Sequence, residues 1–340
     1  MATTQLADLY NPLVFGSIAQ EKQTEGNAFI ASGIMANDAQ LATMASVGGT
    51  IGELTQYKPL DFLVEPTYQT DVVGDKIGTE KVSIQTMNYR RFDLARAWSF
   101  AELAKVQALQ SAGDPVEAVG NRIGAYWASV EQQRVIKSSL GILADCVANH
   151  GSDMIISVAT DAVGGVVDAE RISANVILDA KQTMGDMAED LGVLAVHSVT
   201  YTRLKKENLI DTVVDSEGKV SFMSYMGMRL VVDDSLPAVA GANRITYTSI
   251  LFGGSAYAYA QVPRVDAMAT ERDEKAGNGS GETSLIHRMS GIIHPLGYSM
   301  TSNNLNTDGQ VGYSQLEMAT TFTRVWQRKN IKLAFIQTND

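Results

Sequence analysis

Apolar residues between Asp114 and Val147 recur mostly at spacings of three and four, the period of one face of an α-helix. They are Val116, Val119, Ile123, Tyr126, Val130, Leu140 and Leu143. Asp114 suits an N-cap, Pro115 suits the first helical position, and Glu117 completes a capping box. The sequence therefore predicts a helix over residues 114–147, roughly 50 Å long and about three times the usual globular length.

The apolar period of this helix thins at residues 131–134, where four polar residues follow one another. The interruption excludes a sustained heptad and with it a coiled coil. A long helix that is polar on one side needs a broad sheet or a neighbouring subunit to lie on. We expect Glu131, Gln132 and Arg134 to make polar contacts with partner subunits.

From residue 51 to residue 98 the pattern changes to that of β-strands, with turn residues at 72–78. This pattern predicts a hairpin with two strands of about 15 residues that project roughly 50 Å. A two-stranded hairpin is marginal in water, so much of it must rest on another surface, or else it folds back on its own domain. We expect Gly74 and Gly78 to be the hinge of its tip. The hairpin residues expected to contact a neighbouring subunit are Gly74, Asp75, Lys76, Gly78, Lys81, Arg90 and Arg91.

The flanking segments predict an arm before the hairpin and a mixed domain after the long helix. Residues 1–50 are poorly periodic and are expected to lie on another surface as an arm, or to be a partly disordered tail. Ser99 and Glu102 predict a short helix that stops at Gly113. Further helices are expected at 173–191, with Gly192 as C-cap, and at 199–207, capped by Ser198. Strands are expected at 193–196, 228–232, 245–252, 256–261, 284–300 and 325–336. A charged glycine-rich loop is expected at 271–282. This alternation is typical of an α+β or α/β domain.

The composition indicates a folded protein and argues against a nucleic-acid-binding one. The chain has 340 residues, enough for roughly two domains, and 45% hydrophobic with 19% charged residues is ordinary for a folded protein. The net charge of −11, without a block of Lys and Arg, argues against sequence-specific nucleic-acid binding. The single cysteine, Cys146, fits a small buried residue in a reducing compartment. The sequence shows neither a signal peptide nor a membrane-spanning apolar run, so we expect a soluble intracellular product.

A search for catalytic or ligand-binding motifs nominates no active site. The glycines at 277–281 lack the flanking strand and helix of a phosphate-binding loop, and no serine lies in a Gly-x-Ser-x-Gly elbow. None of the four histidines has metal-ligand spacing, and Asp233-Asp234 is more typical of a turn than of a magnesium site. We therefore expect no enzyme activity, no cofactor and no metal.

The second half of the chain is similar to a known family. The residues that carry this resemblance, in order, are Leu178-Asp179-Ala180-Lys181-Gln182-Thr183-Met184-Gly185-Asp186, Val196-His197-Ser198, Tyr201 and Leu204, Leu209-Ile210, Tyr225-Met226-Gly227, Arg229-Leu230-Val231-Val232-Asp233-Asp234, Pro237, Tyr247-Thr248-Ser249, Leu251-Phe252-Gly253, Glu271-Arg272-Asp273 and Ile293-His294-Pro295-Leu296-Gly297. Their succession resembles the major capsid proteins of tailed bacteriophages, which have the Hong Kong 97-type fold. The resemblance runs from about Asp114 to the C-terminus.

This resemblance implies an α+β fold with a defined anatomy. Residues 1–50 would be the N-terminal arm and 51–98 the hairpin that is called the E-loop. Residues 99–151 and 284–314 would form a peripheral domain around the spine helix 114–147. Residues 152–283 and 315–340 would form the axial domain near the five- and six-fold vertices.

The resemblance also implies a function and its partners. The chain would self-assemble as hexamers and pentamers into the icosahedral head that encloses the double-stranded DNA of a tailed phage, built in the host cytoplasm and kept in the virion. A separate scaffolding protein and a portal are expected, decoration proteins are an open possibility, and no membrane is involved. The alternatives are a cellular nanocompartment of the same fold and a soluble α/β enzyme.

Overall fold

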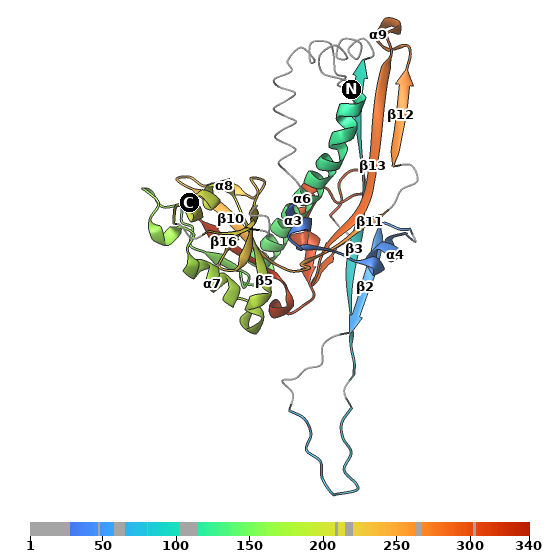
Figure 1. Ribbon diagram of the computed structural model, residues 1–340. Helices are drawn as coiled ribbons and strands as arrows, with labels where there is room; N and C mark the ends of the chain where they lie inside the picture. The colour runs from blue at the N-terminus through green and yellow to red at the C-terminus, as the bar shows by residue number, and fades with distance from the viewer. Residues whose placement is uncertain are drawn as a thin grey trace.

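A long helix lies between two β-sheets, and a hairpin projects from the end of one sheet (Figure 1). The computed structural model describes residues 28–46, 48–57, 65–79, 81–101, 115–207, 210–214, 220–262, 267–301 and 304–340. Residues 1–27 of the predicted arm and the capping residue Asp114 lie outside this part of the chain. The mixture of helices and strands confirms the predicted α+β class.

Helix α6, Pro115–Asn149, is the predicted spine helix. It has 35 residues and ends two positions beyond the predicted Val147. In its second half Val135, Ile136 and Ile142 have no exposed surface. Burial on this scale explains why the helix persists through the polar stretch 131–134, because most helical stability in proteins comes from packing of one face.

The six-stranded sheet supports one side of α6. Its strand order is β1-β11-β13-β3-β2, and β12 also pairs with β13. The strands are β1 (Met35–Asn37), β2 (Ile51–Tyr57), β3 (Ile84–Ala101), β11 (Tyr257–Val262), β12 (Met268–Asp273) and β13 (Glu282–Pro295). Strand β3 pairs with β13 as far as Ala101↔Glu282, so Ser99 lies in a strand and the prediction that it caps a helix is wrong. The rest of that predicted helix falls outside the described residues.

The eight-stranded sheet lies on the other side of α6, in the strand order β4-β16-β10-β5-β8-β7-β6, with β9 also paired to β10. Its strands are β4 (Ile155–Ser157), β5 (Leu191–Val196), β6 (Asp211–Val214), β7 (Val220–Tyr225), β8 (Met228–Val232), β9 (Ala238–Ala240), β10 (Ile245–Gly253) and β16 (Leu333–Thr338). Alternate residues face two cores. In β5, Val193 and Ala195 pack with α6, whereas Leu194 and Val196 pack with α7 (Ala174–Gln182) and α8 (Ser198–Lys206).

Short elements complete the chain. They are α3 (Ala28–Ala31), α4 (Ala39–Ser46), η1 (Asp168–Glu170), η2 (Gly185–Asp190), α9 (Ala276–Gly279), β14 (Tyr298–Met300), α10 (Tyr313–Leu316), η3 (Ala319–Thr321), β15 (Phe322–Arg324) and η4 (Arg328–Asn330). Part of the predicted arm lies on its own subunit, because β1 pairs in parallel with β11, and Phe29, Ile34 and Leu41 are fully buried.

Several local predictions of caps need correction. Ser173 caps α7 as predicted, but the helix ends at Gln182 and Gly192 lies inside β5. The N-cap of α8 is His197, whose Nδ1 accepts the amide of Val199, rather than Ser198. An imidazole nitrogen can replace a hydroxyl here because either satisfies a free first-turn N–H.

The division between the sheets also differs from the prediction. Strands β10 and β11 were expected to flank a turn, but they belong to different sheets. The chain therefore returns to the sheet of the spine helix at Tyr257, well before residue 284. Residues 271–273, expected in a loop, are the end of β12 and pair with β13. Glu271, Arg272 and Asp273 are consecutive charged residues and all exposed, and sequence cannot distinguish such a strand end from a polar loop.

Gly141 sets how closely the C-terminal segment approaches the spine helix. A Cβ at this position would lie 2.0 Å from the carbonyl oxygen of Leu316 and 2.7 Å from the ring of Phe322. Those atoms belong to a backbone turn and a buried ring, so neither can move away cheaply.

We predict that Gly141→Ala lowers the free energy of unfolding by about 1–3 kcal/mol, because overpacking outweighs the gain in helix propensity. The matched control is Gly124→Ala, at an exposed position of α6 with no atom within 4 Å of the new methyl group. It should raise stability by about 0.5–1 kcal/mol. Urea unfolding of both variants measures the difference, and equal effects would contradict the packing argument.

Candidate assembly interface

The projecting hairpin is built on a short two-stranded base. Strands β2 and β3 pair antiparallel from Ile51↔Arg90 to Tyr57↔Ile84. Gly52 lies opposite Tyr89, and a Cβ on Gly52 would come within 2.3 Å of the tyrosine ring. The missing side chain lets the buried Tyr89 lie flat across β2 and anchors the hairpin to the sheet.

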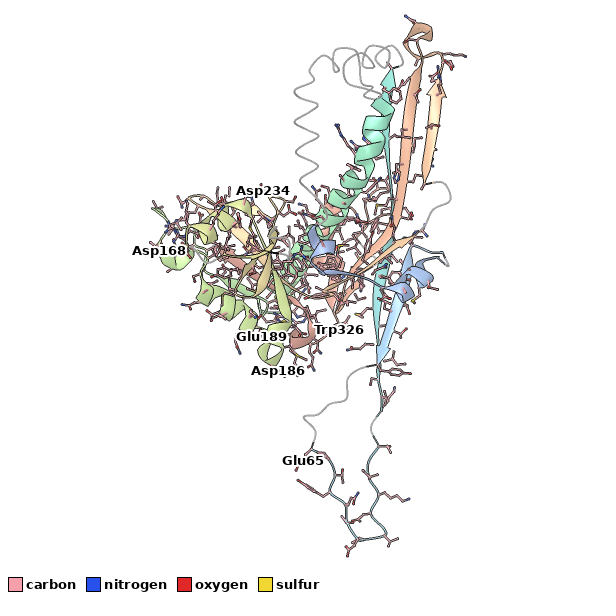
Figure 2. The ribbon with its side chains drawn as sticks, in the orientation of Figure 1. Glu65, Asp168, Asp186, Glu189, Asp234 and Trp326 are labelled. Atoms are coloured by element: carbon pink, nitrogen blue, oxygen red, sulfur yellow. The ribbon has the colours of Figure 1, made fainter. Side chains whose placement is uncertain are left out.

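Residues 65–79 form the distal part of the hairpin, without helix or strand, and extend far from the rest of the subunit (Figure 2). Within the described part of the chain their hydrogen bonds are internal. Tyr68 donates to Glu65 at 2.6 Å, Thr70 donates to Asp75 at 2.9 Å, and the amide of Asp75 donates to the Val72 carbonyl at 3.0 Å. The tip is shaped by its own short-range bonds, and among the described residues no hydrogen bond joins it to either sheet.

Large apolar side chains are exposed along this hairpin. Those with more than half of their surface in solvent are Tyr57, Tyr68, Val72, Val73, Ile77, Val82 and Ile84. Val73 is fully exposed. A run of exposed apolar residues on one projecting element is typical of a surface that another protein covers.

The predicted contact residues of the tip are placed on this exposed segment. Every residue from 65 to 79, including Gly74, Asp75, Lys76 and Gly78, is exposed, and so is Lys81. Neither glycine adopts a positive φ, and open space surrounds both. The role of Gly74 and Gly78 as a hinge stays a prediction. It would depend only on the backbone freedom of a residue without a side chain, because neither position requires glycine for its conformation or for space.

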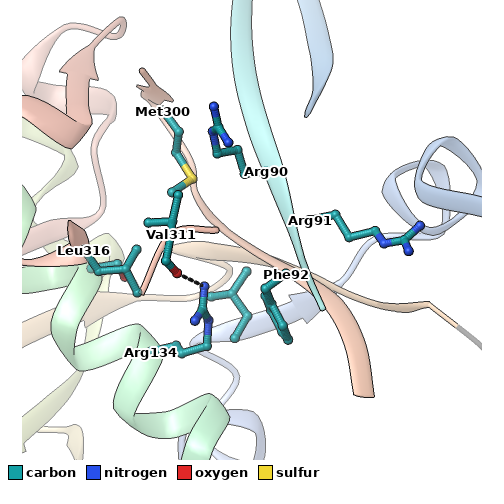
Figure 3. Close-up of a pocket in the computed structure, with 9 residues that line it drawn as sticks. Arg90, Arg91, Phe92, Arg134, Met300, Val311 and Leu316 are labelled. Atoms are coloured by element: carbon teal, nitrogen blue, oxygen red, sulfur yellow. Dashed lines mark hydrogen bonds between the residues drawn. The ribbon is translucent and has the colours of Figure 1, made fainter. Parts of the chain in front are cut away.

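Arg90 and Arg91 lie in β3 and differ from that prediction. Arg90 is buried, with 8% of its surface exposed, and it lines a small cavity together with Arg134 of the spine helix (Figure 3). Arg91 forms an ion pair with Asp93 at 2.9 Å on the other face of the strand. Within the subunit Arg90 is thus buried and Arg91 is ion-paired, and their contacts with a neighbouring subunit stay a prediction.

Glu131, Gln132 and Arg134 also differ from the expectation of partner contacts, because all three are buried within the subunit. Glu131 accepts the hydroxyl of Tyr259 at 2.7 Å. Burial, and then this hydrogen bond, raise the pKa of that tyrosine. Gln132 donates to Asp233 in the loop after β8. Arg134 donates to the Val311 carbonyl at 3.1 Å. The polar stretch of the helix joins the two sheets within one chain.

A second exposed surface lies at the end of the eight-stranded sheet farthest from α6, near Asp168 in Figure 2. Asp161 accepts the backbone amides of Ala242, Asn243 and Arg244 at 2.8–3.0 Å, and these bonds hold its pKa below the ordinary value. Arg244 forms an ion pair with Glu170. Four valine and isoleucine side chains are exposed around this clamp: Val163, Val167, Val239 and Ile245.

Within the described residues, no group of three His, Cys, Asp or Glu is placed to hold a metal ion. No helix in that part of the chain is long and apolar enough to span a membrane. Asp233 and Asp234 accept backbone amides: Asp233 accepts that of Ser235 two residues on, and Asp234 accepts that of Ser198 at the start of α8. The described surface has two regions with exposed apolar side chains, the hairpin and the surroundings of the Asp161 clamp.

Solved structures with the same architecture are phage capsids. The capsid of Ralstonia phage GP4 superposes with a TM-score of 0.56 at 11% identity, over 90% of this chain and 87% of that one. The capsid asymmetric unit of cyanophage Pam1 gives a TM-score of 0.57 at 9% identity, over 93% and 92%. The fold is therefore the Hong Kong 97-type fold of capsid subunits.

Sequence comparison gives the family. The model of the family described as "Major capsid protein 13-like" matches residues 94–278. The major capsid protein of Bacillus phage SPP1 is 30% identical, with 98% of this chain and 97% of that protein covered. The chain belongs to the major capsid protein 13-like family: it is a structural shell protein of a tailed-phage virion and not an enzyme.

Sequence reasoning missed the apolar character of the hairpin tip. The signal was present, because Val72, Val73 and Ile77 interrupt a run of turn residues where solvated side chains are the rule. It also missed the Asp161 clamp, whose members lie about 80 residues apart and meet only in the fold.

The clamp predicts a pH dependence of stability. The hydrogen bond from Arg244, then that from Thr160, lowers the pKa of Glu170 from 4.5 to about 2. Because the folded-state pKa is depressed, this stabilisation is present above pH 4.5 and is lost as the pH falls toward 2. Glu170→Gln should therefore flatten the decline of the unfolding midpoint across this window. The control Asp186→Asn, at an exposed position of η2, should follow the wild-type curve. A wild-type slope in Glu170→Gln would contradict the role of the clamp.

Proposed function

We propose that the subunit assembles with copies of itself, as hexamers and pentamers, into the closed icosahedral head that encloses double-stranded DNA. The observation that carries this proposal is the hairpin at residues 65–79, which exposes apolar side chains and makes its hydrogen bonds internally. Each hairpin lies across a neighbouring subunit and covers its apolar side chains there. This is a head-to-tail contact, and such contacts close into rings.

The energy available to this contact is sufficient for assembly. Full burial of one Val or Ile side chain contributes about 1.5–3 kcal/mol. Several such side chains follow one another in the hairpin, so partial burial of each already offsets the ordering of the tip. The exposed valines around the Asp161 clamp offer a second contact, where axial ends meet around a symmetry axis.

Charge supports enclosure of DNA without tight binding. The net charge of −11 gives the wall as a whole the sign of the phosphate backbone. Few phosphate contacts and little counterion release are expected, so the genome can be packed and ejected. By the same proposal a separate scaffolding protein and a portal take part in assembly in the host cytoplasm, with decoration proteins as further candidates.

The division into regions keeps the proposed arm at residues 1–50 and the E-loop at 51–98. The proposed peripheral domain contains 99–151 around the spine helix. It takes in residues from Tyr257 onward, because β11 and β12 pair with β13. The axial domain then consists of 152–256 and the end of the chain from 315.

We predict that deletion of residues 72–78 leaves a folded subunit that does not form shells. The deleted residues lie in an exposed segment away from both cores, so the unfolding midpoint should stay at the wild-type value. Electron microscopy and sedimentation of protein expressed with its scaffolding protein measure the yield of shells. A normal yield from this deletion would overturn the role of the hairpin.

A single substitution tests the apolar contact. Val73→Asp should lower the shell yield at least about tenfold, because a loss of about 1.4 kcal/mol per contact changes each association constant tenfold. The control is Leu178→Asp, at an exposed position of α7 on the eight-stranded sheet, which should assemble normally. Equal loss in both variants would point to general insolubility instead of hairpin docking.

A further inference from the structure

The backbone passes from the eight-stranded sheet to the six-stranded sheet through a very short connection. Strand β10 ends at Gly253 and strand β11 begins at Tyr257, so only residues 254–256 lie between the two sheets here. Ser255 has a φ of 58°, which is uncommon for a residue with a side chain. Domain hinges are typically a few residues at the ends of elements, and this connection has that form.

Residues 29–38, between the start of α3 and the start of α4, lie directly on this connection. The amide of Ser255 donates to the carbonyl of Gly33 at 2.9 Å, and the amide of Tyr257 donates to the carbonyl of Ile34 at 3.1 Å. Strand β1 then pairs in parallel with β11. This part of the segment is therefore bonded to the connection itself and to the six-stranded sheet.

The first part of the same segment is bound to the eight-stranded sheet. Phe29 has no exposed surface, and its ring lies 5.6 Å from the ring of Phe252 in β10. Arg229 of β8 donates to the carbonyl of Ala31 at 2.5 Å. The two parts are joined by a turn in which the amide of Ile34 donates to the Phe29 carbonyl at 3.2 Å. Figure 1 shows α3 at the junction of the two sheets, with the chain continuing to α4 on the six-stranded sheet.

We propose that residues 29–38 are a strap that holds the two sheets at one angle, and that the connection at 254–256 turns as a hinge when the strap is not seated. The segment is fixed on both sides of the connection, so a rotation must break either the ring packing of Phe29 or the backbone bonds to Ser255 and Tyr257. Packed interfaces have discrete arrangements, so release gives a second angle and not a gradual drift. The consequence for assembly rests on the proposed function: a seated strap presents the hairpin and the axial end of every subunit in the same relative orientation.

The distance between two spin labels, one on each sheet, measures this angle in the purified, unassembled subunit. The labels are attached at Leu178→Cys, at an exposed position of α7, and at Thr270→Cys, at an exposed position of β12. Cys146 is buried and should stay unlabelled. Pulsed electron paramagnetic resonance should give one narrow distance distribution for this labelled protein.

Gly33→Ala should add a second distance and broaden the distribution at least about twofold, because it weakens the seated strap against other angles. Gly33 has a φ of 80° and no atom lies within 4 Å of a new Cβ, so the substitution strains the strap without a clash. The matched control is Gly48→Ala, with a φ of 102° and equally open space, but beyond α4. Its distribution should stay narrow. Phe29→Ala, which removes the ring packed on Phe252, should broaden the distribution further than Gly33→Ala.

A distribution of wild-type width in both Gly33→Ala and Phe29→Ala would overturn the strap, and so would equal broadening in Gly48→Ala. If Phe29→Ala does not fold, the comparison of Gly33→Ala with Gly48→Ala still decides. The distances are measured before assembly, so a wild-type subunit that forms no shells would count against the proposed function and not against the strap.

Discussion

Burial of the second half of α6 between two sheets is the constraint on which the rest of the subunit depends. Val135, Ile136 and Ile142 have no exposed surface, and they belong to one core with residues of β3, β13, β5, β10 and β16. Neither sheet could hide its inner face without the helix, and the helix could not persist alone in water. The helix and the two sheets, although far apart in the sequence, therefore share one hydrophobic core.

Polar groups make this shared core specific. Tyr257 of β11 is fully buried. Its hydroxyl forms hydrogen bonds with the hydroxyls of Ser138 and Ser139 on α6. Gln132 bonds to Asp233, and Arg134 bonds to the Val311 carbonyl. An apolar helix face alone would tolerate sliding along the sheets, whereas these bonds fix its register, since any shift leaves a buried polar group unsatisfied.

The sequence predicted the spine helix, the hairpin and most strands, because periodicity and capping are local signals. Ser173 before α7 and the alternation in β3 are examples. It could not predict which sheet a strand joins: β10 and β11 look alike, yet they separate at a turn. The same limit applies to Glu131, Gln132 and Arg134, whose contacts within the subunit could not be predicted from the sequence. A polar stretch on a helix reads as a solvated or partner-facing surface, and only the fold brings Tyr259, Asp233 and Val311 to it.

Strand β3 belongs at once to the projecting hairpin and to the six-stranded sheet. Its ladder with β13 runs without a break from Arg91↔Ile292 to Ala101↔Glu282. Hydrogen bonds in an antiparallel ladder lie across the strand direction. A pull on the hairpin along its own axis, such as pressure inside a filled shell would exert, therefore loads all of these bonds in shear instead of opening them one after another. The force that the connection between hairpin and subunit withstands therefore grows with the number of residues paired between β3 and β13.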